Sequence, residues 1–174
     1  MKEELKIVKI DTKYCNYLRK FDSRVPYNYG KKALRPFVGV LFRVGNFMYF
    51  APLSSPKAKH LNMKAKIDFL KIDNGKLGVV NFNNMLPVTK TNITLLDLNG
   101  VHKKSVEQKY NKLLKEQLYW LNRNKEKLYN RAQKLYEKYI NKTLNISIRE
   151  RCCDFKLLEE KCGLYNLILE KVNT

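Results

Sequence analysis

In the first hundred residues, short apolar runs bounded by turn signals predict β-strands. The third run shows this most clearly, because Phe47, Tyr49 and Ala51 alternate with neighbours that point to the opposite face. Gly45-Asn46 and Asp73-Asn74-Gly75 are turn signals that predict two hairpins. The expected strands are Leu5–Ile10, Phe37–Val44, Phe47–Pro52, Ile67–Ile72, Leu77–Phe82, Met85–Val88 and Ile93–Leu98.

Two of these strands carry further information. Phe37–Val44 is apolar almost throughout and is therefore expected to be central in the sheet. Pro52 has no N–H to donate to a neighbouring strand, so we expect it to end the third strand.

Apolar residues take three- and four-residue spacing in one early segment and again after residue 105, which predicts amphipathic helices. Asp11 or Thr12 can cap the first helix and Asp154 the last, near whose end Gly163 lies. Asn122-Arg123-Asn124 kinks or separates the two middle helices. The expected helices are Tyr14–Phe21, Val106–Leu121, Leu128–Tyr139 and Asp154–Tyr165, with a short helical turn over His60–Lys66.

These elements together predict an α+β fold in a single domain over residues 1–174. The sheet is expected to be compact, strongly twisted and antiparallel. Closure into a partly open barrel, which would protect the strand edges, is the alternative arrangement. The helical C-terminal half is expected to cover the sheet.

The net charge of the chain indicates what kind of partner it binds. The chain has 35 Lys and Arg residues against 16 Asp and Glu residues, a net charge of +19. Positive charges in such excess repel one another and destabilise the fold unless a polyanion neutralises them. Nucleic acid is the favoured polyanionic partner, and an anionic membrane surface is the alternative. No apolar run approaches the roughly 20 residues that a membrane-spanning helix needs.

The cysteines and the N-terminus favour a reducing cytoplasm. Met1–Asp11 alternates charged and apolar residues and lacks the apolar core of a signal peptide. The four cysteines contain no Cys-x-x-Cys pair, and the adjacent Cys152 and Cys153 are poorly spaced for zinc, so free thiols are expected. The sequence predicts no metal site and no cofactor.

Two loops carry candidate chemistry. Ser54–His60 follows the third strand and holds two hydroxyls, two ammonium groups and an imidazole, which together can hold a phosphate and move a proton. Tyr27–Arg35 combines aromatic rings with cations, which suits bases and phosphates together. From composition alone, a solvated basic loop remains the simpler interpretation of each segment.

The order of motifs along the chain resembles one known family. The most specific piece is Ala51–Lys57, which reads Ala-Pro-Leu-Ser-Ser-Pro-Lys. The other pieces are Tyr17-Leu18, Phe21-Asp22, Arg24-Val25-Pro26, Pro36–Gly39, His60, Leu77–Phe82, Met85–Pro87, Leu95–Leu98 and Asp154–Lys161. They resemble the ToxN/AbiQ family, the protein toxins of type III toxin–antitoxin systems, over nearly the whole chain, and within it the CptN branch.

The resemblance implies a metal-independent endoribonuclease that acts in phage defence, with a twisted antiparallel sheet similar to the Kid/MazF toxins. It implies inhibition by a small repeated RNA that folds as a pseudoknot and is cut from its precursor by the toxin. It also implies that toxin and RNA alternate in closed rings, commonly three of each.

The same resemblance implies which residues form the site. The Ser-Pro-Lys loop contributes Ser54, Ser55 and Lys57, with Lys59 beside them, and the role of His60 stays open. The other loop contributes a tyrosine, Tyr29 or Tyr27, and a cation. The candidates for that cation are Lys31, Lys32 and Arg35.

The chemistry also has a rationale of its own. RNA supplies its own nucleophile, the 2′-hydroxyl, so a protein has to orient it, move protons and neutralise the charge that grows on the phosphate. Lysines and hydroxyls can do this and leave a 2′,3′-cyclic phosphate and a 5′-hydroxyl. A non-catalytic RNA- or DNA-binding protein and, more remotely, a membrane-surface protein are the alternatives.

A second RNA-binding surface is expected on the helical half. Lys109, Lys112 and Lys115 fall on the helical face opposite the apolar stripe and are expected to be exposed. A face that only aids solubility usually mixes both signs of charge, whereas this one is mostly positive.

Overall fold

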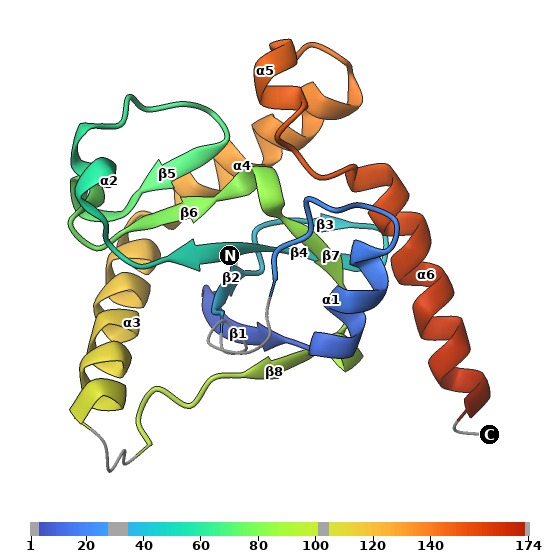
Figure 1. Ribbon diagram of the computed structural model, residues 1–174, viewed down its shortest axis with the longest axis horizontal. Coiled ribbons are helices and arrows are strands. Elements are labelled where there is room, and N and C mark those ends of the chain that lie inside the picture. The colour runs from blue at the N-terminus through green and yellow to red at the C-terminus, as the bar shows by residue number, and fades with distance from the viewer. Residues whose placement is uncertain (1–3, 28–34, 101–104, 173–174) are drawn as a thin grey trace.

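The computed structural model describes residues 4–27, 35–100 and 105–172, which fold as α+β (Figure 1). Within these ranges, eight strands form one open antiparallel sheet in the order β5-β6-β4-β2-β1-β8, and β3 and β7 also pair with β4. The sheet is not closed, so the strand edges are not protected by closure. The strands are β1 (Lys6–Ile10), β2 (Phe37–Gly39), β3 (Arg43–Val44), β4 (Phe47–Ser54), β5 (Phe69–Lys71), β6 (Val79–Asn81), β7 (Leu86–Val88) and β8 (Ile93–Leu95).

Helices flank the sheet. In Figure 1, α3 lies beside the end of β4, whereas α1 and α6 lie together on the opposite side. The helices are α1 (Thr12–Arg19), α2 (Ala58–Asn62), α3 (Ser105–Arg123), α4 (Lys125–Ile140), α5 (Ile146–Arg149) and α6 (Phe155–Val172), with 3-10 turns η2 (Ile72–Gly75), η3 (Phe82–Asn84) and η4 (Lys90–Asn92). The helical C-terminal half is therefore confirmed.

Strand β4 is the centre of the sheet. It pairs with β2 and β3 along one edge and with β6 and β7 along the other. Its residues from Met48 to Leu53 are all buried. The hydroxyl of Tyr49 donates a 2.7 Å hydrogen bond to Glu159 of α6, which ties the strand to the helical half.

The long second strand predicted over Phe37–Val44 is broken into β2 and β3. Val38 faces Ala51 of β4, but Arg43 faces Met48, so five steps along one chain oppose three along the other. Two extra residues are accommodated between them as a local distortion of the ladder. The apolar pattern gave no sign of this change in register.

Pro52 does not end β4, which continues to Ser54. The N–H of Leu53 donates to Pro36 on the β2 side, so the nitrogen of Pro52 faces the other edge. Pairing with β7 stops at Phe50 on that edge, and pairing with β6 begins at Leu53. The proline therefore lies at a gap where no N–H is needed.

The expected helix caps are present, but some helix bounds differ: α1 ends at Arg19 rather than Phe21, and the turn expected over His60–Lys66 is the helix α2. Asp11 and Asp154 cap α1 and α6 with 2.8 and 3.2 Å bonds to backbone N–H groups, and Asn124 separates α3 from α4. Helix α6 continues past Gly163, which had been expected near its end. Beyond that glycine, Tyr165 packs on Tyr14 with ring centroids 5.1 Å apart, and this packing outweighs the low helix propensity of glycine.

Candidate active site

The site begins where β4 ends at Ser54, which is half-buried. The side-chain amide of Asn81 on β6 donates a 3.0 Å hydrogen bond to Ser54 Oγ. Because Oγ already accepts this bond, the proton of the hydroxyl is directed elsewhere. Ser54 is therefore arranged to donate a hydrogen bond to a group bound at the end of β4.

The backbone of Ser54 is held from a third element, helix α3. Buried Gln117 donates from Nε2 to the carbonyl oxygen of Leu77 at 2.6 Å and to that of Ser54 at 3.4 Å. Gly78 lies against the same Ser54 carbonyl with φ +99°, and a Cβ there would overlap the oxygen. Only glycine allows this close approach, so β6 and α3 together fix the direction of the Ser54 peptide.

The loop after Ser54 is exposed until His60, which is buried beneath it. His60 Nδ1 accepts the backbone N–H of Lys57 at 3.2 Å, and the backbone N–H of His60 donates to the Lys57 carbonyl at 2.9 Å. Burial lowers the pKa of His60, and the charges of Lys57, Lys59 and Lys71 lower it further. A neutral imidazole that accepts from the backbone holds the loop, so the geometry gives His60 a positioning role.

Arg35 at the end of the second predicted loop reaches the same place. Phe37 faces Pro52 in the β2–β4 ladder, and the Pro36 carbonyl accepts from Leu53 N at 2.9 Å. The same register carried two residues further places Arg35 opposite Ser54. The structure therefore brings together the ends of the two loops that the sequence singled out.

Arg35 is half-buried, and burial lowers its pKa, as does the nearby charge of Arg19. The Arg19 guanidinium also covers the ring of Tyr27, 4.3 Å from its centroid, and Tyr27 is exposed. Arg19 therefore interacts with both the Arg35 charge and the Tyr27 ring. The predicted site residues Tyr29, Lys31 and Lys32 lie outside the described residues.

The predicted basic face of α3 is exposed. Lys109, Lys112 and Lys115 are all open to solvent, while Leu114 and Leu121 are buried against the sheet, as the spacing predicted. Lys112 lies 3.9 Å from the carboxylate of Glu116, one turn further along the helix. The same helix therefore presents lysines outward and Gln117 inward to Ser54.

Sequence reasoning missed Asn81, Gln117 and Gly78. Gln117 had a visible signal, because it is a polar residue on the apolar stripe, three residues after Leu114 and four before Leu121. Asn81 and Gly78 had none, since their partner Ser54 is more than twenty residues away and their proximity depends on the β4–β6 pairing.

The site therefore gathers hydroxyls, an amide, ammonium groups and guanidinium groups, which are donors suited to an oxyanion such as a phosphodiester. In the described residues, no group of three or more His, Cys, Asp or Glu side chains is placed to hold a metal ion. None of the helices in the described ranges is long and apolar enough to cross a membrane.

Comparisons with known proteins agree with one another. Residues 6–163 match the family described as Toxin ToxN, type III toxin–antitoxin system. The chain is 33% identical over 169 residues to endoribonuclease ToxN of Bacillus thuringiensis subsp. kurstaki, which covers 94% of this chain and 86% of the relative. It is 30% identical over 172 residues to endoribonuclease AbiQ of Lactococcus lactis subsp. lactis, which covers 93% and 90%.

Solved structures give the same result. One, from work on selective inhibition of a type III toxin by a non-coding RNA pseudoknot, superposes with a TM-score of 0.78 at 30% identity and covers 94% of this chain and 99% of that one. Another is AbiQ, a lactococcal anti-phage endoribonuclease of a type III toxin–antitoxin system, with a TM-score of 0.80 at 29% identity and the same two coverages.

Proposed function

The chain belongs to the ToxN family of type III toxin–antitoxin systems and is an endoribonuclease toxin, and we propose that it cuts RNA at the Ser54–Lys57 loop without a metal ion. The observation that supports this location is the end of β4, where the Leu53 N–H donates to the Pro36 carbonyl, so that Ser54 and Arg35 each follow or precede a paired residue. There, Ser54 receives a hydrogen bond from Asn81, and the β2–β4 ladder ends two residues before it at Pro52, opposite Phe37.

The proposed reaction is an internal displacement at phosphorus. The 2′-oxygen of a ribose attacks the adjacent phosphorus, its proton passes to a base, and the bond from phosphorus to the leaving 5′-oxygen breaks as that oxygen gains a proton. The products are a 2′,3′-cyclic phosphate and a 5′-hydroxyl, and no water is consumed. The protein accelerates this step by orientation and by donors aimed at the charge that grows on the phosphate oxygens.

The described residues suit that task in different ways. Ser54 has its hydroxyl proton free to point at a phosphate oxygen, and exposed Ser55 and Lys57 follow it on the loop. Arg35 is proposed to supply a permanent charge, because a guanidinium stays protonated even when burial lowers its pKa. Tyr29 and Lys32 are proposed to complete the catalytic set.

Further interactions with the RNA chain are proposed on both sides of this set. Lys59 is exposed on α2, two residues after Lys57, and Tyr27 is exposed next to Arg19. Lys31 is proposed to add charge on the same side. An exposed ring and cations together suit single-stranded RNA, because bases stack on the ring while phosphates pair with the charges.

We propose that an RNA pseudoknot encoded as a small repeat inhibits this toxin in the cytoplasm, and that toxin and RNA form a closed ring of three each. The pseudoknot inhibits the toxin in one similar structure. The exposed lysines of α3 support the ring, because a second RNA-binding face on the same chain lets each protein link two RNA molecules.

The first test separates an enzyme from a non-catalytic RNA-binding protein. Purified wild-type chain is incubated with RNA in EDTA, and product ends are identified by mass spectrometry. Removal of one positioned donor costs about 10²–10³ in rate, so Ser55→Ala and Lys57→Ala should each lose cleavage and toxicity while keeping the wild-type melting temperature. Lys90→Ala, which removes an exposed lysine from η4, is the matched control. Binding without cleavage by wild type would favour the non-catalytic protein.

The second test concerns the basic face. Reversal of Lys109, Lys112 and Lys115 to Glu should reduce the assembled mass with the antitoxin RNA and flatten the dependence of affinity on salt. The expected change in the log–log slope is about 0.7 for each phosphate of single-stranded RNA that the protein no longer neutralises. Reversal of three other exposed lysines, Lys13, Lys20 and Lys90, provides a control of equal charge. An unchanged mass and slope would refute the second surface and leave the nuclease assignment intact.

A further inference from the structure

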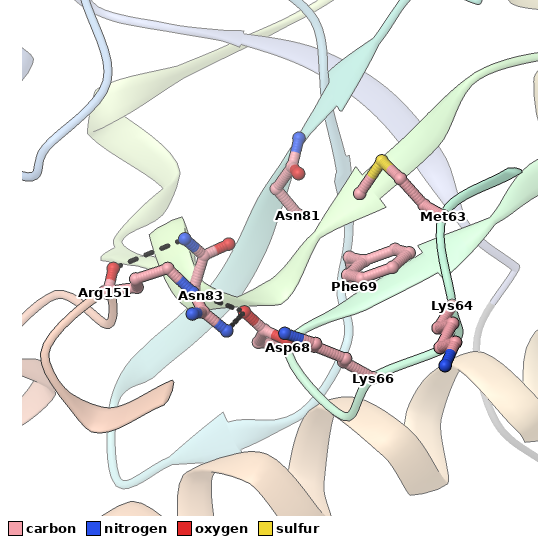
Figure 2. Close-up of a pocket in the computed structure, with 8 residues that line it drawn as sticks. All are labelled: Met63, Lys64, Lys66, Asp68, Phe69, Asn81, Asn83 and Arg151. Atoms are coloured by element: carbon pink, nitrogen blue, oxygen red, sulfur yellow. Dashed lines mark hydrogen bonds and ion pairs between the residues drawn. The ribbon is translucent and has the colours of Figure 1, made fainter. Parts of the chain in front are cut away.

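A pocket of about 490 Å³ opens beside the candidate active site (Figure 2). Asn81 belongs to both, because it lines the pocket and also donates to Ser54 Oγ. A ligand in this pocket is therefore separated from the catalytic serine by a single side chain. The residues that line it are Met63, Lys64, Lys66, Asp68, Phe69, Asn81, Asn83 and Arg151.

Asp68 at the base of this pocket is buried, with 4% of its surface exposed. Its Oδ2 accepts from Arg151 Nε at 3.2 Å and Nη2 at 2.9 Å. Its Oδ1 is buried and has no hydrogen-bond partner. A buried carboxylate oxygen without a donor is costly, so it calls for an explanation.

The other buried carboxylates of the described chain are satisfied at both oxygens. Asp22 receives bonds from Arg24 at Oδ1 and from the Asp154 backbone at Oδ2. Glu159 accepts from Tyr49 at Oε1 and from Lys156 at Oε2. Since the fold pairs these groups completely, the unpartnered oxygen of Asp68 is the exception among the buried carboxylates of the described residues.

The rest of the pocket indicates which kind of ligand could supply a donor to that oxygen. Lys64, Lys66 and Arg151 are exposed cations on its rim, which suit the phosphates of an RNA chain. Met63 and Phe69 contribute apolar surface, which suits the face of a flat ring. The rim lysines are long and exposed, so they can move aside as a ring enters. Cations at the rim, apolar side chains and a buried carboxylate together match a nucleotide.

We propose that this Asp68 pocket binds one base next to the scissile phosphate, and that Asp68 Oδ1 accepts a hydrogen bond from its exocyclic amino group. Adenine, cytosine and guanine carry such a group. Uracil does not, and its carbonyl oxygens beside the ring N–H would repel the carboxylate. The proposal rests on the endoribonuclease activity and adds to it a preference for an amino-bearing base at one position.

The test measures base preference rather than activity alone. Wild-type chain cuts an RNA pool randomised on both sides of the cleaved bond, and the product ends are sequenced. Wild type should disfavour uracil at one position by roughly 5- to 100-fold, the range expected for one base-specific hydrogen bond. Asp68→Asn offers a donor as well as an acceptor, so it should accept uracil to within about twofold of the other bases.

The control is Arg151→Gln, which removes a rim charge and keeps the Asp68 carboxylate. It should slow all substrates alike and leave the base preference unchanged. If Asp68 only orients Arg151, then Asp68→Asn will behave in the same way, with an unchanged preference, and the proposal is overturned.

A second measurement needs no protein variant and covers the case in which Asp68→Asn does not fold. Purine riboside replaces adenosine at the selected position, which deletes only the amino group. Wild type should lose the same 5- to 100-fold, and equal cleavage of both RNAs would overturn the proposal. An absence of any cleavage by wild type would instead count against the endoribonuclease mechanism, so the two failures are distinct.

Discussion

Gly78→Ala should impair catalysis far more than folding. Gly78 has φ +99°, and a Cβ there would overlap the Ser54 carbonyl oxygen and lie 3.0 Å from the carbonyl carbon of Ser55. The strained backbone alone costs about 1–3 kcal/mol, which lowers the melting temperature by about 2–12 °C in a chain of this size. Relief of the overlap displaces the Ser54 peptide. A misplacement of about 1 Å costs about 10²-fold in rate, so kcat should fall by about that factor.

Gly45→Ala is the matched control at the opposite end of β4. Gly45 also has a positive φ, +53°, but a Cβ there would meet nothing within 4 Å. This variant should be destabilised by about 1–2 kcal/mol through its backbone conformation, without displacement of the Ser54 peptide. Thermal melts and single-turnover cleavage of RNA in EDTA are measured for both variants. If Gly78→Ala cleaves as fast as Gly45→Ala, the Ser54 peptide is not part of the catalytic geometry.

Four other expectations follow from the same structure. Asn81→Asp should reduce kcat about 10²-fold or more, because a carboxylate accepts the Ser54 proton and repels phosphate. Asn81→Ala should reduce kcat only about tenfold, and equal losses in the two variants would contradict this reasoning. The lowered pKa of His60 means that the folded state binds fewer protons than the unfolded state. The free energy of unfolding in urea should therefore fall as the pH drops below 6.5 through the folded pKa, and it should fall less in His60→Gln. His60→Gln should cost under tenfold in rate, and a loss of 10²–10⁴ would make His60 the proton carrier. Burial raises the pKa of the four thiols, so a thiol reagent at pH 8 should label them only after unfolding; they are Cys15, Cys152, Cys153 and Cys162.

The sequence predicted correctly the turns and helix caps, which depend on residues close to one another in the chain. Asp73-Asn74-Gly75 predicted a hairpin, and all three residues have positive φ between β5 and β6. Asp11 and Asp154 predicted helix caps for the same reason, because a cap depends on residues one turn away. Where the outcome depended on distant pairing, as at Pro52, the sequence pattern misled.

The residues of the candidate site also fall into those that the sequence predicted and those that only the folded structure shows. Ser54 and Lys57 were predicted because they stand in a specific motif, and Arg35 because it ends a basic loop. Their neighbours Asn81 and Gln117 come from β6 and α3, and only the packed fold shows that they touch Ser54. A single sequence records hydrogen-bonding capacity but not the partner that a residue meets across a sheet.

The position of Ser54 explains how an exposed basic loop can hold the catalytic geometry that we propose. Four strands border β4, and Tyr49 ties it to Glu159, so the strand has little freedom to move. Ser54 is its last residue and inherits that rigidity, which Gln117 and Gly78 extend to its carbonyl group. Lys57, three residues further on, is exposed and depends on the buried His60 for its backbone position. Rigidity therefore decreases stepwise from the centre of the sheet to the loop. A substitution near Ser54 should act mainly on kcat, whereas one near Lys57 should also change how tightly RNA binds, and separate measurement of kcat and KM in the two sets of variants distinguishes these effects.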